Sequence, residues 1–212
     1  MSVTLAQYIT QCRRLLHDAN ANFYTDNELT DYINDARNKL VRDTGCLRTI
    51  QSIDALENQE VYDFSELPHG DRTIDILNIN LYWGNTRIPM RYMAWTEFNA
   101  QMRYWQNYIG RPIAFSLYGP QKFYLGPVPD QTYTMELDTV IEPTPMTNLN
   151  DTDTIPDIWT SPVAFYACYT AKFKEQSYAE ADIFNQQYVK KVQSVLVGTF
   201  TRRMPNPYSQ AY

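Results

Sequence analysis

The sequence predicts an α+β protein: both chain ends form one helical bundle, and the middle forms an antiparallel β domain, either a sandwich or an open barrel. Three observations favour this class. Long amphipathic stretches lie near the two ends, strand-like runs separated by turn residues lie between them, and a proline-containing tail follows the last helix. The expected organisation is a bundle from 1–46 and 157–198, a β-rich insertion with its linker at 47–156, and an extended arm at 199–212.

The first 46 residues predict a hairpin of two amphipathic helices, of which the first spans about 3–19. Thr4 and Thr25 are each followed three residues later by Gln or Glu, the spacing of a capping box that satisfies free backbone N–H groups. Gly45 stands where the second helix needs a left-handed C-terminal cap. The apolar stripe of the second helix comprises Leu29, Tyr32, Ile33, Ala36, Leu40 and Val41.

The region from about 47 to 141 is predicted to be mostly strands, because runs rich in Ile, Tyr and Leu with partial alternation are bounded by turn residues. Helical spacing of Trp95, Phe98 and Met102 predicts one embedded helix at 94–108. The expected strands cover 48–53, 60–64, 72–83, 88–92, 113–118, 122–125 and 133–141.

Two helices are expected after a linker dense in Pro, Thr, Asn and Asp at 142–156. Ser161 is a candidate N-cap with Pro162 at the first helical position, and Ser177 with Glu180 repeats the capping-box spacing. Gly198 is expected to end the last helix. The core-facing residues predicted for that helix are Ile183, Phe184, Tyr188, Val192, Val195 and Leu196.

The helix after Pro162 is apolar on more than one side. Such a helix is buried centrally or lies at a subunit contact. Its aromatic residues are therefore predicted to contact another subunit: Phe165, Tyr166, Tyr169 and Phe173.

The stretch 199–212 is interpreted as an interaction arm, with a frayed terminus as the alternative. Its two prolines oppose regular helix, and its aromatic residues are of the type that anchors interfaces. Its adjacent arginines suit an acidic partner surface. The residues expected to bind are Phe200, Arg202, Arg203, Met204, Pro205, Pro207, Tyr208 and Tyr212.

Composition excludes several classes of protein. The net charge of −6 argues against a protein that grips the nucleic-acid backbone. No apolar run approaches the ~20 residues that span a bilayer, and no signal-peptide pattern opens the chain, so a cytoplasmic setting without a membrane is expected. Seventeen tyrosines among 212 residues favour strands and wet interfaces. The three cysteines predict no disulfide framework, and Cys12 and Cys168 are expected to be buried.

The sequence carries no signature of catalysis, cofactor binding or metal binding. It lacks GxxxxGK[ST], GxGxxG and GxSxG. His17 and His69 are the only histidines, too few to build a recognisable zinc site with three scattered thiols. The stretch from Asp151 to Asp153 lacks the spaced ligands of a calcium loop and is interpreted as a solvated linker. No cofactor, metal or catalytic residue is therefore predicted.

The chain resembles the head-to-tail adaptors of tailed bacteriophages, of the podovirus type called connector or tail tubular proteins. The resemblance rests on the helical hairpin with its Tyr24-Thr25-Asp26 start, the β-rich insertion, the aromatic helix after Trp159 and the Arg/Pro/Tyr tail. It implies a structural virion protein at the head–tail junction, assembled in the host cytoplasm. It further implies a ring of twelve copies, arms that bind the portal protein, a β domain that meets a tail or nozzle protein, and DNA passing through the channel without specific binding.

Two other functions stay open at this point. One is a cytoplasmic enzyme or small-ligand-binding module that uses the β domain as its pocket. The other is a tail or baseplate structural protein that never meets a portal. A ring-former should give higher oligomers or bind a portal, whereas a pocket protein should show ligand-dependent stability.

Overall fold

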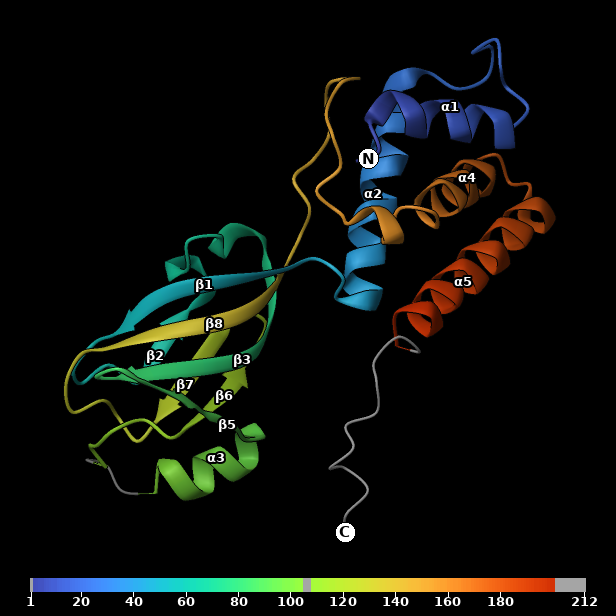
Figure 1. Ribbon diagram of the computed structural model, residues 1–212. Helices are drawn as coiled ribbons and strands as arrows, with labels where there is room; N and C mark the ends of the chain where they lie inside the picture. The colour runs from blue at the N-terminus through green and yellow to red at the C-terminus, as the bar shows by residue number, and fades with distance from the viewer. Residues whose placement is uncertain (1, 105–107, 201–212) are drawn as a thin grey trace. The chain divides into compact units, whose positions relative to one another are not determined.

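The structure is a computed structural model that describes residues 2–104 and 108–200 (Figure 1). The chain divides into two compact units. One, called here the helical unit, comprises Met1–Cys46 and Pro143–Tyr212, and the other, the β unit, comprises Leu47–Glu142. Helices at both chain ends and mainly antiparallel sheets in the middle confirm the α+β fold class. The predicted extended arm lies outside the described residues, except for 199 and 200.

Capping boxes start both helices of the N-terminal hairpin, as predicted. The N–H of Glu28 donates to the Thr25 hydroxyl, and the N–H of Thr25 donates to the Glu28 carboxylate. Thr4 and Gln7 make the same reciprocal pair. Gly45 has a φ of 59°, the left-handed conformation expected of this C-terminal cap. The four α-helices of the helical unit are α1 (Leu5–Leu15), α2 (Asp26–Thr44), α4 (Val163–Lys174) and α5 (Tyr178–Phe200).

Several helix ends differ from the predicted ones. Helix α1 ends at Leu15 rather than near residue 19, because His17 turns into the left-handed region. Pro162 is the N-cap of α4 rather than its first helical residue. Helix α5 continues past Gly198 to Phe200, since a glycine can also adopt helical angles at a modest cost. Of the residues predicted to face the core from this helix, Ile183 is exposed instead.

The segment 143–156 belongs to the helical unit and is not a solvated linker of the β insertion. Asp153 is buried, and its Oδ1 accepts hydrogen bonds from Nε and Nη2 of Arg37 at 3.0 and 2.8 Å. Its Oδ2 accepts one from the Tyr8 hydroxyl at 2.7 Å. Burial and the adjacent Asp153 carboxylate raise the pKa of the Tyr8 hydroxyl far above its usual range. A buried ion pair therefore joins this segment to α2, and a hydrogen bond joins it to α1.

Two four-stranded sheets form a sandwich in the β unit, with strand orders β1-β8-β3-β4 and β2-β7-β6-β5. All paired neighbours are antiparallel except β5 and β6, which are parallel. The run 88–92, predicted as one strand, splits at Met90 between the two sheets. The strands are β1 (Arg48–Ala55), β2 (Val61–Asp63), β3 (Thr73–Trp83), β4 (Thr86–Pro89), β5 (Arg91–Tyr92), β6 (Ala114–Tyr118), β7 (Lys122–Gly126) and β8 (Tyr133–Ile141).

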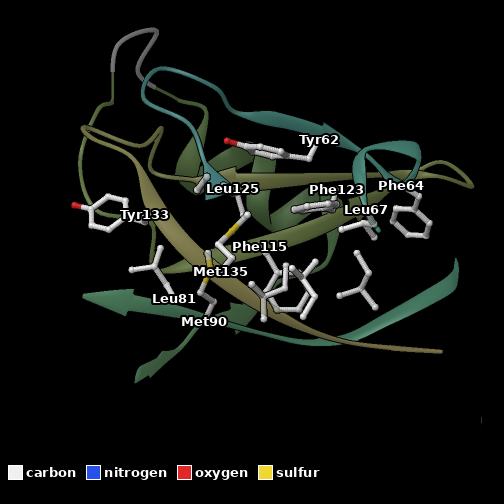
Figure 2. Packing of buried hydrophobic residues seen from close by; sticks show 14 residues of the cluster. Tyr62, Phe64, Leu67, Leu81, Met90, Phe115, Phe123, Leu125, Tyr133 and Met135 are labelled. Carbon is white, nitrogen blue, oxygen red and sulfur yellow. The ribbon is translucent and has the colours of Figure 1, made fainter. Parts of the chain in front are cut away.

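Side chains from both sheets fill the space between them (Figure 2). The rings of Tyr62 and Phe123 stack with their centroids 5.2 Å apart. Helix α3 (Trp95–Met102), the embedded helix expected at 94–108, packs against β6 and buries Phe98 completely. The interior of the sandwich is therefore a packed core.

Gly70 is a position where we expect a large effect from one added methyl group. A Cβ there would overlap the carbonyl oxygen of Phe64 and lie 2.7 Å from the Cα of Ser65. Because both are backbone atoms, they cannot give way, and Gly70→Ala should destabilise the β unit by about 1–3 kcal/mol. Gly110→Ala is the control, since among the described residues its Cβ would approach only Pro127, at 3.9 Å. Equal urea midpoints for the two variants would contradict this expectation.

Candidate assembly surfaces

A row of aromatic side chains lies along α4 and reaches the start of α5; it is called here the aromatic row and comprises Tyr166, Tyr169, Phe173 and Tyr178. The ring centroids of successive members are 5.4, 5.9 and 5.4 Å apart. Tyr166 and Tyr169 are half-buried, whereas Phe173 and Tyr178 are 53% and 58% exposed. Aromatic side chains at this exposure provide apolar contact area together with hydroxyl groups that keep a polar partner.

Small residues on the opposite side of α4 fix the direction of the row. Ala164, Ala167, Cys168 and Ala171 are buried, which lets α4 pack closely within the unit and directs the larger rings away. As predicted, Cys168 is buried, as is Cys12, and both thiols are free. The apolar second side of α4 is thus partly core and partly surface.

Tyr188 of α5 supports the inner end of the row. Its ring centroid lies 5.1 Å from that of Tyr166, and its hydroxyl donates to Oδ2 of Asp43 at 2.8 Å. Burial and the Asp43 carboxylate raise the pKa of the Tyr188 hydroxyl well above its usual range, so this donor stays protonated. The hydrogen bond ties α5 to α2 beneath the row.

The predicted contact residues of α4 do not all lie together. Tyr166, Tyr169 and Phe173 join the aromatic row, but the half-buried Phe165 lines a separate groove with Leu15 and Ala164. Sequence reasoning missed Tyr178 as a member of the row. The signal was available, because Tyr178 follows Phe173 by five residues across the short α4–α5 turn.

The predicted portal-binding arm falls almost wholly outside the described residues. Phe200 is the exception, and its backbone belongs to α5 rather than to an extended segment. Arg202, Arg203, Met204, Pro205, Pro207, Tyr208 and Tyr212 lie beyond the part of the chain that the structure describes.

The β unit presents a polar groove of about 390 Å³ on the outer face of the β1-β8-β3-β4 sheet. Glu136 accepts hydrogen bonds there from the Tyr82 hydroxyl and from Arg87. Arg48 and Asp138 form a longer ion pair at 4.0 Å. This charged, open surface suits contact with another macromolecule, while the sandwich interior is already filled by side chains.

Within residues 2–104 and 108–200, no three His, Cys, Asp or Glu side chains gather as metal ligands. His69 stands in a loop, as the sequence predicts, and its Nδ1 lies 3.4 Å from Nη2 of Arg72. His17 also stands in a loop, although the expected first helix at about 3–19 included it. Among the same residues, no helix has the length and apolar character needed to cross a membrane.

Comparison with known proteins identifies the family. A search of curated proteins finds no match. The family model described as SU10 adaptor protein matches residues 3–209, almost the whole chain. This match includes both parts of the helical unit, the β unit inserted between them and most of the C-terminal arm. The chain therefore belongs to the SU10 adaptor protein family, and it is a bacteriophage head-to-tail adaptor, a structural component of the head–tail junction.

Proposed function

We propose that this adaptor forms a closed ring of twelve copies between the portal and the tail, and that the ring lines the channel through which DNA leaves the head. The aromatic row of the helical unit is the observation that carries the proposal. A soluble protein that worked alone would have little reason to present four contacting rings on one surface. A heterologous contact through such a patch closes into a ring when the rotation between neighbours allows it.

The proposal extends to the partners of the ring. The C-terminal arm binds the portal protein, and the polar outer groove of the β unit contacts a tail or nozzle protein. Assembly takes place in the host cytoplasm before the virion is complete. With a net charge of −6, the ring repels phosphate, so DNA passes during ejection without being held.

The test removes two aromatic side chains of the aromatic row together. Tyr169→Ala with Phe173→Ala should leave the circular dichroism spectrum close to that of the wild type, because both side chains are at least partly exposed. Adaptor occupancy on purified heads should fall by roughly 30-fold or more if the pair contributes as an interface hot spot of about 2 kcal/mol.

Ile183→Ala is the matched control. Ile183 is 59% exposed on α5 and does not belong to the aromatic row, so its variant should occupy heads like the wild type. Wild-type occupancy for the double variant would refute the role of the row. If the double variant folds and attaches to heads as single copies, the portal contact does not depend on the aromatic row, whereas the contact between neighbouring copies does.

A further inference from the structure

The loop between α1 and α2 holds one phenyl ring out in solvent. Phe23 is 79% exposed, whereas the next residue, Tyr24, is buried. The ring is called here the Phe23 knob. Most exposed apolar side chains need no explanation, but the loop that carries this one is held by several backbone hydrogen bonds to a single carboxylate.

The carboxylate of Asp18 organises that loop. It accepts hydrogen bonds from the N–H groups of Asn22 at 2.8 Å and Tyr24 at 3.1 Å, and from Nη1 of Arg13 at 3.1 Å. Burial opposes ionisation of the Asp18 carboxyl, but the hydrogen bonds from these donors outweigh the effect of burial and lower its pKa. The carboxylate that holds the loop is therefore charged near neutral pH.

The backbone geometry also indicates that the loop is held in one conformation. His17 and Ala21 adopt φ values of 56° and 57°, which non-glycine residues rarely occupy. Nη2 of Arg13 also donates to the carbonyl of Tyr24 at 3.0 Å. Strained conformations persist only where the surrounding contacts determine them, and they gather at functional segments. A pre-organised loop loses little entropy when its exposed ring is buried by a partner.

A groove of matching character lies between α1, α4 and α5 of the same unit. It is called here the Phe165 groove, and its residues include Arg14, Leu15, Ser161, Ala164, Phe165 and Lys191. Its volume is about 320 Å³. An apolar cavity of about 150 Å³ is enough to bind benzene, so a phenyl side chain fits.

Charge distinguishes the two surfaces. Arg14 and Lys191 of the groove form no ion pair with any residue in the described ranges 2–104 and 108–200. The knob leads directly into the first two turns of α2, which carry Asp26, Glu28 and Asp31. Asp26 and Glu28 pair within the subunit with Arg13 and Lys174, whereas Asp31 is exposed. A cation beside an aromatic face adds a favourable interaction, and the exposed carboxylate of Asp31 complements the basic groove.

We propose that the Phe23 knob of one copy inserts into the Phe165 groove of the next copy. The inference rests on the proposed ring, and it names a contact between its subunits. The high exposure of Phe23 shows that it does not fill the groove of its own chain, so the proposed contact is one between two copies. Knob and groove are different patches of one subunit. In the proposed ring each knob enters the groove of the next copy only, which is a heterologous contact, whereas reciprocal insertion by two copies would give a two-fold pair.

Cysteine trapping between two differently tagged chains tests this contact. The background variant is Cys46→Ser, since Cys12 and Cys168 are buried and Cys46 is only half-buried. Phe23→Cys in one chain and Leu15→Cys in the other are mixed, assembled onto heads and oxidised. A disulfide between the two tags is expected. Leu149→Cys, which replaces another exposed apolar residue of the helical unit, replaces Phe23→Cys as the control and should give no such product.

The possible outcomes distinguish failure of the Phe23 contact from failure of the proposed twelve-copy ring. Normal adaptor occupancy on heads without a 23–15 disulfide would overturn the knob contact and leave the ring standing. A disulfide between two Phe23→Cys chains would overturn it in favour of a two-fold contact. If the heads carry no adaptor at all even for the background variant, the proposed function fails first.

Phe23→Ala gives an independent measurement. We expect the affinity between neighbouring copies to fall by roughly 30-fold, the effect of losing an interface hot spot. The melting temperature should not change, because the exposed phenyl side chain contributes little to the core of the subunit. Leu149→Ala is its control. Equal adaptor occupancy for the two variants across a dilution series would contradict the proposal.

Discussion

Asp153→Ala should lower the free energy of unfolding of the helical unit by about 3–5 kcal/mol, the usual cost of breaking a buried ion pair by removing one partner. The side chains of Arg37 and Asp153 are 1% and 0% exposed. Without the carboxylate, the Arg37 guanidinium keeps its charge in the core and loses two hydrogen bonds. The Tyr8 hydroxyl loses its acceptor as well, which adds a second unsatisfied buried group.

Hydrogen exchange followed by mass spectrometry is the suitable measurement, because it reports on each unit separately. Protection should fall in peptides from α1, α2 and 143–156 and stay unchanged in the strands of the β unit. Asp35→Asn is the control, since Asp35 is exposed on α2. Arg37→Met combined with Asp153→Leu should recover part of the lost stability, because it removes both charges together. Wild-type protection in Asp153→Ala would contradict the role assigned to the pair.

Local chemistry made much of the fold predictable. The capping boxes at Thr4 and Thr25 and the left-handed cap at Gly45 depend on residues within one turn of one another, so the sequence displays them directly. The strands were predictable for the same reason, since alternation and turn residues act over short distances. These features set the class and the order of elements.

Long-range pairing explains what the sequence could not reveal. Asp153 stands in a stretch with the composition of a solvated linker, and its partner Arg37 is 116 residues away. Nothing near either residue indicates burial. The run 88–92 has the appearance of one strand, yet Met90 donates its N–H to Ile79 in one sheet while Arg91 donates to Ile113 beside the other. The surface role of Phe23 was missed because exposure is a property of the folded loop.

Removal of residues 201–212 should abolish attachment of the adaptor to DNA-filled heads while leaving its fold and melting temperature nearly unchanged. The structure sets the cut after Phe200, where α5 ends, rather than after Gly198. Among the described residues, the buried hydrophobic core extends no further along α5 than Val192, so the deletion spares it. In the proposed function attachment depends on the arm, whose aromatic residues would anchor the portal contact, while Pro205 and Pro207 would reduce the entropy lost on docking.

Arg202→Ala with Arg203→Ala should give a milder, salt-dependent defect. In the proposed contact these charges would meet carboxylates on the portal and accelerate encounter, so their loss should slow association most at low ionic strength, where screening is weakest. The substitution Tyr208→Ala should instead weaken attachment about equally at all salt concentrations, because it removes an apolar anchor. Occupancy of heads by mass spectrometry across a salt series distinguishes the two. If the truncated adaptor joined heads at wild-type occupancy, the arm would be no more than a frayed end, and portal binding would have to be assigned to the helical unit.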